Sequence, residues 1–267
     1  MGAETAFSFR CQGQPLGGVL HAGEPDAGRG VLVIVGGPQY RAGSHRQFVL
    51  LARSLAARGI PVMRFDARGM GDAGGELRDF TAIDQDIATA IDAFQARQPQ
   101  VGEVVLWGLC DAASAALFYA WRDSRVTGLV LLNPWVRTEA GAARTYLRHY
   151  YLQRLFSGAF WRKLLGGGFA WWSSLRDLAA RFTHAAGGSR GGQETAMAEL
   201  DLPERMAAGL ERFQGPVLCI LSGNDLTAAE FRDLVQGSLQ WGRLLQREQV
   251  LVVNTVCSGQ ISWNLPK

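Results

Sequence analysis

Short apolar runs alternate with longer amphipathic segments along most of the chain. Residues 45–59 and 80–97 carry apolar side chains at helical spacing and predict helices. Residues 7–23 alternate between apolar and polar positions and turn at glycine, which predicts an antiparallel hairpin. Strands that alternate with helices are typical of the α/β class, with a mainly parallel twisted sheet and helices on both faces. The remaining apolar runs predict buried strands, at 30–37, at the start of 60–75, at the start of 104–117, at 126–136, at the start of 215–225 and at 248–254.

The pattern changes between about residue 137 and residue 213. No strand-like run occurs there, and aromatic-rich helical stretches are separated by the glycine-rich linker 187–192. We interpret 137–213 as a helical cap inserted into a core formed by 1–136 and 214–267. The cap aromatics either pack its helices together or line an apolar pocket for an acyl chain. Tryptophans flanked by arginines also fit peripheral contact with a membrane surface.

The composition fits one large core with such an insertion. The chain has 267 residues, 48% hydrophobic and 19% charged, which is enough apolar side chain for a sizeable core. A net charge of +3 with scattered basic residues argues against a nucleic-acid partner. Neither a signal peptide nor a membrane-spanning run is read, so the expected compartment is the cytoplasm. The cysteines lack partners at metal-binding spacing, so we expect no metal and no other cofactor; they are Cys11, Cys110, Cys219 and Cys257.

Cys110 stands where an apolar run breaks at glycine and a helical pattern begins at once, in "GLCDA". One interpretation is a buried core thiol, because free cysteine is among the most buried residue types. The other is a nucleophile displayed on a sharp turn between a strand and a helix. Such a turn needs small residues two positions before and after the nucleophile, since the flanking backbones approach closely. Gly108 and Ala112 meet this need.

Four segments, in chain order, resemble loops of the α/β-hydrolase superfamily. "VGGPQ" (35–39) resembles the oxyanion loop, and "GLCDA" (108–112) the G-x-nucleophile-x-G elbow with Cys for the usual Ser. "FDARGMGDAGG" (65–75) resembles a structural D-x-R-G-x-G-x-S segment, and "SGNDLTAAEF" (222–231) the loop that provides the triad acid. More narrowly, "GGPQYRAGSHRQF", "FDARGMGDAGG" and "WGLCDAASA" resemble hydrolase 1 of the exosortase A system, a family encoded beside exopolysaccharide and protein-sorting genes in Gram-negative bacteria.

The resemblance implies the α/β-hydrolase fold and a division of roles in the site. Cys110 is the expected nucleophile, and the backbone N–H groups of Gly37 and Asp111 are the expected oxyanion donors. Gln39, in the same loop as Gly37, is assigned to substrate binding. Asp225 is the expected triad acid, although its place just before a helical pattern also fits a helix N-cap.

The triad histidine that the resemblance implies is missing from its place after the last predicted strand. The sequence there reads "TVCSGQISWNLPK", which resembles a truncated or frame-shifted end, and no histidine follows His184. The closing helix of the family is not read there either. His45, near the start of the helix after the oxyanion loop, is the candidate for a substitute base or a substrate contact. The other interpretation is an ordinary histidine at a helix start.

Without that base, the ionisation of the thiol governs the chemistry. A helix N-terminus lowers a thiol pKa from about 8.5 and would leave some thiolate, whereas an inward-pointing Asp111 carboxylate would oppose ionisation. The sequence predicts a hydrolase that transfers the acyl group of a small ester or thioester with an apolar portion through Cys110. The alternatives are a catalytically impaired or non-catalytic binding protein of this fold, and an acyltransferase to a sugar or lipid acceptor.

Overall fold

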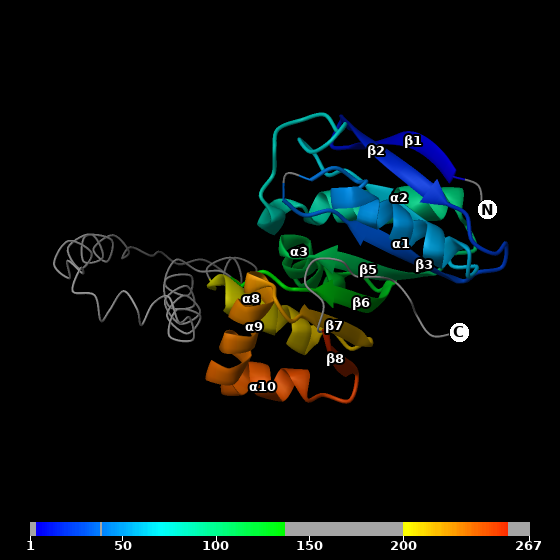
Figure 1. Cartoon of the computed structure of the whole chain (residues 1–267). Coiled ribbons are helices and arrows are strands. Elements are labelled where there is room, and N and C mark those ends of the chain that lie inside the picture. Colours follow the sequence, from blue (N-terminus) through cyan, green and yellow to red (C-terminus); the bar gives the residue numbers. More distant parts are fainter. Residues whose placement is uncertain (1–3, 38, 137–199, 256–267) are drawn as a thin grey trace, which may run out of the picture. The chain divides into compact units, whose positions relative to one another are not determined.

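An eight-stranded sheet organises the part of the chain that the structure describes (Figure 1). This computed structural model describes residues 4–37, 39–136 and 200–255. The strands are β1 Glu4–Cys11, β2 Gln14–His21, β3 Arg29–Ile34, β4 Val62–Phe65, β5 Glu103–Leu109, β6 Val126–Leu132, β7 Val217–Ser222 and β8 Val250–Thr255. Their order in the sheet is β1-β2-β4-β3-β5-β6-β7-β8. The first two strands form the predicted antiparallel hairpin, β2 runs antiparallel to β4, and all neighbours from β4 to β8 are parallel.

Helices follow the parallel strands, as the alternating pattern predicts for βαβ units. The helices predicted over 45–59 and 80–97 are confirmed, each with a short 3₁₀ turn before it. The described helices are η1 Ser44–Arg46, α1 Gln47–Ala56, η2 Phe80–Ala82, α2 Asp84–Arg97, α3 Asp111–Tyr119, η3 Ala120–Arg122, α8 Leu202–Arg212, α9 Leu226–Gly237 and α10 Leu239–Leu245. Figure 1 labels the α-helices among them.

Different helices cover the two faces of the sheet, because successive residues of a strand point to opposite faces. Val33 of β3 packs in a cluster with Phe48 of α1. Its neighbour Leu32 belongs to the cluster on the other face, together with Ile87 of α2. A central parallel strand buried on both faces must be apolar throughout, which is why the run 30–37 shows no polar alternation.

Apolar residues continue at helical spacing from residue 227 to residue 246, which predicts one helix, but the structure has two helices there. α9 ends at Gly237, and Ser238 adopts an extended backbone (φ −126°, ψ 118°). The Ser238 hydroxyl accepts a hydrogen bond from the Trp241 N–H at 3.4 Å and caps α10. Glycine at a helix end and serine at an N-cap are ordinary stop and start signals, but the apolar spacing continues across them.

The chain divides into two compact units, Met1–Arg137 with Leu202–Lys267, and Thr138–Asp201. α8 belongs to the first unit, whereas the sequence placed residues 202–213 in the insertion. The reason is close packing of α8 on α3, since a Cβ at Gly209 would lie 2.1 Å from the carbonyl oxygen of Leu117. Helical periodicity alone could not distinguish a cap helix from a core helix.

The predicted cap aromatics fall on residues 137–199, which lie outside the described residues. The cap, its apolar pocket and its contact with a membrane surface therefore stay predictions. Within the described ranges, no helix combines the length and the apolar character that crossing a bilayer requires.

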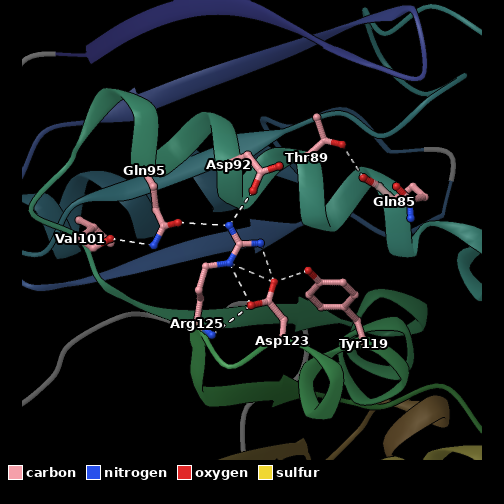
Figure 2. A network of polar contacts seen from close by, with 8 residues as sticks. All are labelled: Gln85, Thr89, Asp92, Gln95, Val101, Tyr119, Asp123 and Arg125. Atoms are coloured by element: carbon pink, nitrogen blue, oxygen red, sulfur yellow. Dashed lines mark hydrogen bonds and ion pairs between the residues drawn. The ribbon is translucent and has the colours of Figure 1, made fainter.

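A network of polar contacts ties α2 to the loop between η3 and β6 (Figure 2). Arg125 donates from Nη1 to Asp92 Oδ1 at 2.6 Å and from Nη2 to Asp123 Oδ2 at 2.7 Å. The Tyr119 hydroxyl donates to the same oxygen of Asp123 at 2.5 Å. Burial alone would raise the pKa of Asp123, but these hydrogen bonds from Arg125 and Tyr119 lower it to about 2. The network fixes the start of β6, at the edge of the sheet opposite the strand ends that carry the motifs.

Candidate active site

Motif loops meet at the carboxyl ends of β3, β5 and β7, the edge where ligands bind in open α/β sheets. The Gly37 N–H donates to Asp111 Oδ2 at 2.7 Å, which joins the loop after β3 to the start of α3. The Thr227 hydroxyl, in the first turn of α9 after β7, hydrogen-bonds the Cys110 sulfur. The charge of Asp225 also acts on this thiol. The structure therefore brings together four of the residues singled out from the sequence.

Cys110 has the backbone of a strained turn between β5 and α3. Its φ of 61° and ψ of −121° lie in a region that residues other than glycine rarely adopt. Its N–H donates to the Leu132 carbonyl at 2.9 Å, and its own carbonyl accepts from the Trp135 N–H at 3.1 Å. A Cβ at Gly108 would lie 2.5 Å from the carbonyl oxygen of Ala112. A glycine is thus required at position 108, two residues before Cys110, as the elbow motif predicts.

The Cys110 thiol is half-buried and held in its protonated form. Burial raises the pKa of this thiol to about 11, and the charge of Asp111 adds to the rise. Hydrogen bonds from the Asp111 N–H and the Thr227 hydroxyl act in the opposite direction without cancelling it. The expectation that the helix N-terminus leaves some thiolate is therefore wrong for this conformation. The other possibility given above, that the Asp111 carboxylate opposes ionisation of the Cys110 thiol, agrees with the structure.

The Asp111 carboxylate binds backbone N–H groups at the start of α3. Its Oδ2 accepts from the Gly37 N–H at 2.7 Å and its Oδ1 from the Ala112 N–H at 2.9 Å. Burial raises the pKa of this carboxyl group, while the same hydrogen bonds act to lower it. A Cβ at Gly36 would lie 1.9 Å from Oδ1, so the loop after β3 approaches the carboxylate only because residue 36 is glycine. The N–H predicted to stabilise an oxyanion already has an anionic acceptor.

The loop that carries Gly37 is anchored by a carboxylate from the segment after β4. Asp66 is fully buried and accepts hydrogen bonds from the Arg41 N–H at 2.7 Å and from the Arg41 guanidinium. These contacts agree with the structural role expected for the "FDARGMGDAGG" segment. In the same loop, Gln39 is half-buried, and its Oε1 is buried with no hydrogen-bond partner among the described residues. The assignment of Gln39 to substrate binding stays a prediction.

Asp225 is the N-cap of α9. Its carboxylate accepts from the Ala228 N–H at 3.0 Å, and its backbone is extended (φ −100°, ψ 130°). The helix-cap interpretation of Asp225 is therefore confirmed. A cap and a triad acid are not exclusive, because its charge acts on the Cys110 thiol and contributes to the raised pKa after burial and Asp111.

Within the described ranges, neither His21 nor His45 is hydrogen-bonded to Cys110 or Asp225. His45 is exposed in η1 and has a positive φ of 49°. His21 is buried on β2, where its Nε2 lies 3.0 Å from the Nε of Arg64. The positions after β8, where the resemblance implies the triad histidine, lie outside the described residues. The role of His45 as a substitute base stays a prediction.

Thr227, whose hydroxyl hydrogen-bonds the candidate nucleophile, is not among the residues predicted from the sequence. Thr227 follows Asp225 by two positions, so a hydroxyl in the first helical turn after the candidate acid was the available signal. Among the described residues, no group of three or more His, Cys, Asp and Glu side chains could hold a metal ion.

Comparison with solved structures gives the fold. The esterase Pf2001 from Pyrococcus furiosus is similar with a TM-score of 0.61 and 12% identity, over 95% of this chain and 83% of that one. GrgF, an α/β-hydrolase from Penicillium sp. sh18, is similar with a TM-score of 0.59 and 15% identity, over 98% and 92%. Est1E from Butyrivibrio proteoclasticus, solved with ferulic acid bound, is similar with a TM-score of 0.58 and 17% identity, over 94% and 89%. These likenesses show the α/β-hydrolase fold.

Comparison of the sequence itself gives the family. No curated protein matches the sequence. The family described as serine aminopeptidase, S33, matches residues 26–230, which run from before β3 into α9 and include residues 35–39, residues 108–112 and Asp225. This match covers most of the chain, so the chain belongs to the serine aminopeptidase S33 family of α/β-hydrolases.

Proposed function

We propose that this chain is an acyl-transfer hydrolase that uses Cys110 on esters or thioesters. The observation that carries the proposal is the elbow backbone of Cys110, with φ of 61° and ψ of −121°. A cysteine that only fills a core has no need of this backbone, because an ordinary helix start would bury it without strain. Strain of this kind concentrates at functional sites, where it displays a side chain.

The proposed reaction has two covalent steps. The sulfur of Cys110 attacks the substrate carbonyl carbon, a C–S bond forms, and the bond from that carbon to the leaving oxygen or sulfur breaks with its electron pair. The thiol proton goes to the leaving group or to solvent. Water then adds to the acyl-enzyme thioester and releases a carboxylic acid and the free thiol. The N–H groups of Gly37 and Asp111 would stabilise the oxyanion, with Asp225 as orienting acid and His45 as substitute base.

The proposed substrate is a small ester or thioester with an apolar acyl portion. The aromatic side chains of the predicted cap favour an apolar group, and Gln39 would contact the substrate near the carbonyl. Pf2001 is an esterase and Est1E was solved with ferulic acid, which supports an ester as the substrate class. The sequence resemblance further suggests a link to exopolysaccharide and exosortase systems. We propose that the reaction takes place in the cytoplasm, where the thiol would stay reduced.

The test is acylation by p-nitrophenyl esters of increasing acyl length, read as nitrophenolate release and as the mass of the acylated chain. We expect acylation and turnover that depend on Cys110 and are lost in Cys110→Ala. Cys11→Ala is the matched control, because Cys11 is a buried cysteine on β1. The proposal fails if Cys110 neither reacts with a thiol-selective label faster than Cys11 nor supports turnover above Cys110→Ala. Product analysis with and without a sugar or lipid acceptor separates hydrolysis from acyl transfer to that acceptor.

A second candidate is a non-catalytic binding protein that retains the hydrolase fold. The specific observation in its favour is the Asp111 carboxylate on the Gly37 N–H, next to a thiol whose pKa is raised to about 11. This candidate predicts that Cys110→Ala binds an ester ligand as tightly as the unmodified chain and that neither chain is acylated. Equilibrium binding of a non-hydrolysable ether analogue, measured beside the acylation assay, distinguishes the two.

A further inference from the structure

The backbone donors of the proposed oxyanion site already hold an anion, which belongs to the residue after the nucleophile. Both carboxylate oxygens of Asp111 are used, Oδ2 by the Gly37 N–H at 2.7 Å and Oδ1 by the Ala112 N–H at 2.9 Å. The N–H of Asp111 itself also acts on this carboxylate and on the Cys110 sulfur, and it lowers the pKa of each group. The two N–H groups assigned to the oxyanion are thus the groups that face the carboxylate.

We propose that the Asp111 carboxylate is an internal competitor of the substrate carbonyl oxygen, and that acylation of Cys110 requires the carboxylate to leave the Gly37 N–H. This inference rests on the proposed function of Cys110. An N–H group makes one strong hydrogen bond at a time, so a developing oxyanion and the carboxylate cannot both take it. Two negative charges at hydrogen-bond distance from the same donor also repel each other strongly away from bulk water.

The loop after β3 fits closely around the Asp111 carboxylate, which supports a specific contact between them. A Cβ at Gly36 would meet Asp111 Oδ1 at 1.9 Å and the Ala112 nitrogen at 2.8 Å, so any larger residue at position 36 would exclude the carboxylate. Asp111 is half-buried in the first turn of α3, so its side chain has a path to solvent through a rotation about its own bonds. The contact can therefore open without unfolding the helix.

A purely structural role for Asp111 makes the opposite prediction. If the carboxylate only holds the loop after β3 against α3, its removal would misplace the Gly37 N–H and slow acylation. If the carboxylate competes with the substrate, its removal frees the donor and speeds acylation. The sign of the effect of Asp111→Ala on acylation distinguishes the two roles, once the change in thiol reactivity has been measured separately.

The experiment compares two reactions of Cys110 in the full chain. Acylation by p-nitrophenyl acetate needs the oxyanion donors, whereas alkylation by iodoacetamide reads only the thiol, and peptide mass spectrometry locates both products. The variants are Asp111→Ala, which removes the competitor, and Asp111→Asn, which removes the charge but keeps one acceptor oxygen for the Gly37 N–H. Glu76→Ala is the matched control, since it removes an exposed acid from the loop between β4 and η2.

We expect both Asp111 variants to be alkylated faster, because each removes the negative charge beside the sulfur. The ratio of acylation to alkylation should rise about tenfold or more in Asp111→Ala only, since one oxyanion donor contributes roughly 10²–10³ in rate. An unchanged or lower ratio in Asp111→Ala overturns the inference and leaves the proposed function standing. No acylation of Cys110 in any chain overturns the proposed function and the inference with it.

A measurement on the unmodified chain keeps the inference falsifiable if Asp111→Ala does not fold. Amide hydrogen exchange at Gly37 reports whether its N–H is hydrogen-bonded. Slowing of about tenfold or more relative to a free amide supports the inference, and exchange at the rate of a free amide overturns it.

Discussion

The backbone of Cys110 predicts an unusual order of stability, in which Cys110→Gly is more stable than Cys110→Ala. Both substitutions remove the sulfur and its hydrogen bond from Thr227, so their difference isolates the Cβ. A Cβ at φ 61° and ψ −121° costs about 1–3 kcal/mol, which glycine avoids. The greater conformational freedom of glycine in the unfolded chain lowers the stability of the glycine variant by about 0.5–1 kcal/mol. The balance favours the glycine variant by about 1 kcal/mol.

The assay is urea denaturation followed by far-ultraviolet circular dichroism, with the free energies of unfolding of the two variants compared directly. The matched control is Ala88→Gly, because Ala88 is half-buried in the regular helix α2. Glycine in a helix interior should lower the free energy of unfolding by about 1 kcal/mol relative to alanine, the opposite sign to position 110. Equal losses from Ala to Gly at positions 88 and 110 would refute the strained elbow.

Three further predictions concern the thiol, the elbow packing and the network at the opposite sheet edge. Alkylation of Cys110 should still rise about tenfold per pH unit between roughly pH 8 and pH 10, because burial raises its pKa to about 11; a plateau near pH 9 would contradict that burial. Gly108→Ala should lower the free energy of unfolding by about 1–3 kcal/mol in urea denaturation, since its Cβ would lie 2.5 Å from the Ala112 carbonyl oxygen; an unchanged value would contradict this contact. Although burial opposes it, the hydrogen bond from Arg125 lowers the folded-state pKa of Asp123 to about 2, so this carboxylate stabilises the fold above its unfolded pKa of about 3.9. Urea denaturation should therefore show a loss of stability from about pH 4 to pH 2 that is smaller in Asp123→Asn, and equal losses would contradict the pairing.

The architecture could be predicted from the sequence because it follows from local periodicity. Alternate burial of Leu32 and Val33 on opposite faces requires an unbroken apolar run, and the sequence of β3 displays that run directly. Two other features of the structure do not follow from local periodicity. The break at Gly237 and Ser238 is set by cap chemistry in two residues, and the membership of α8 in the core is set by a contact of Gly209 with a distant part of the chain.

The backbone turn at Cys110 could be predicted from the sequence, but the directions of the side chains around it could not. The spacing of small residues around Cys110 reports how closely two backbones approach, so the motif predicts the elbow. Nothing in the motif states which way the Asp111 carboxylate turns, because its direction depends on the room left by Gly36 and on the donor at Gly37. The sign of the thiol pKa shift follows from that direction and from burial. The direction of the Asp111 carboxylate and the shift of the thiol pKa therefore both arise from contacts between residues far apart in the chain.

In the proposed reaction, the position of the Asp111 side chain links two obstacles to acylation of Cys110. One obstacle is the occupied Gly37 N–H and the other is a thiol kept protonated by burial and by the nearby charge. If the Asp111 carboxylate rotates away, the Gly37 N–H becomes free and the Cys110 sulfur loses its anionic neighbour in the same movement. With serine in place of Cys110, this rotation would only free the Gly37 N–H, because a hydroxyl still needs a base to become a nucleophile. A thiol ionises closer to neutral pH, so a site whose opening removes a negative charge suits cysteine better than serine.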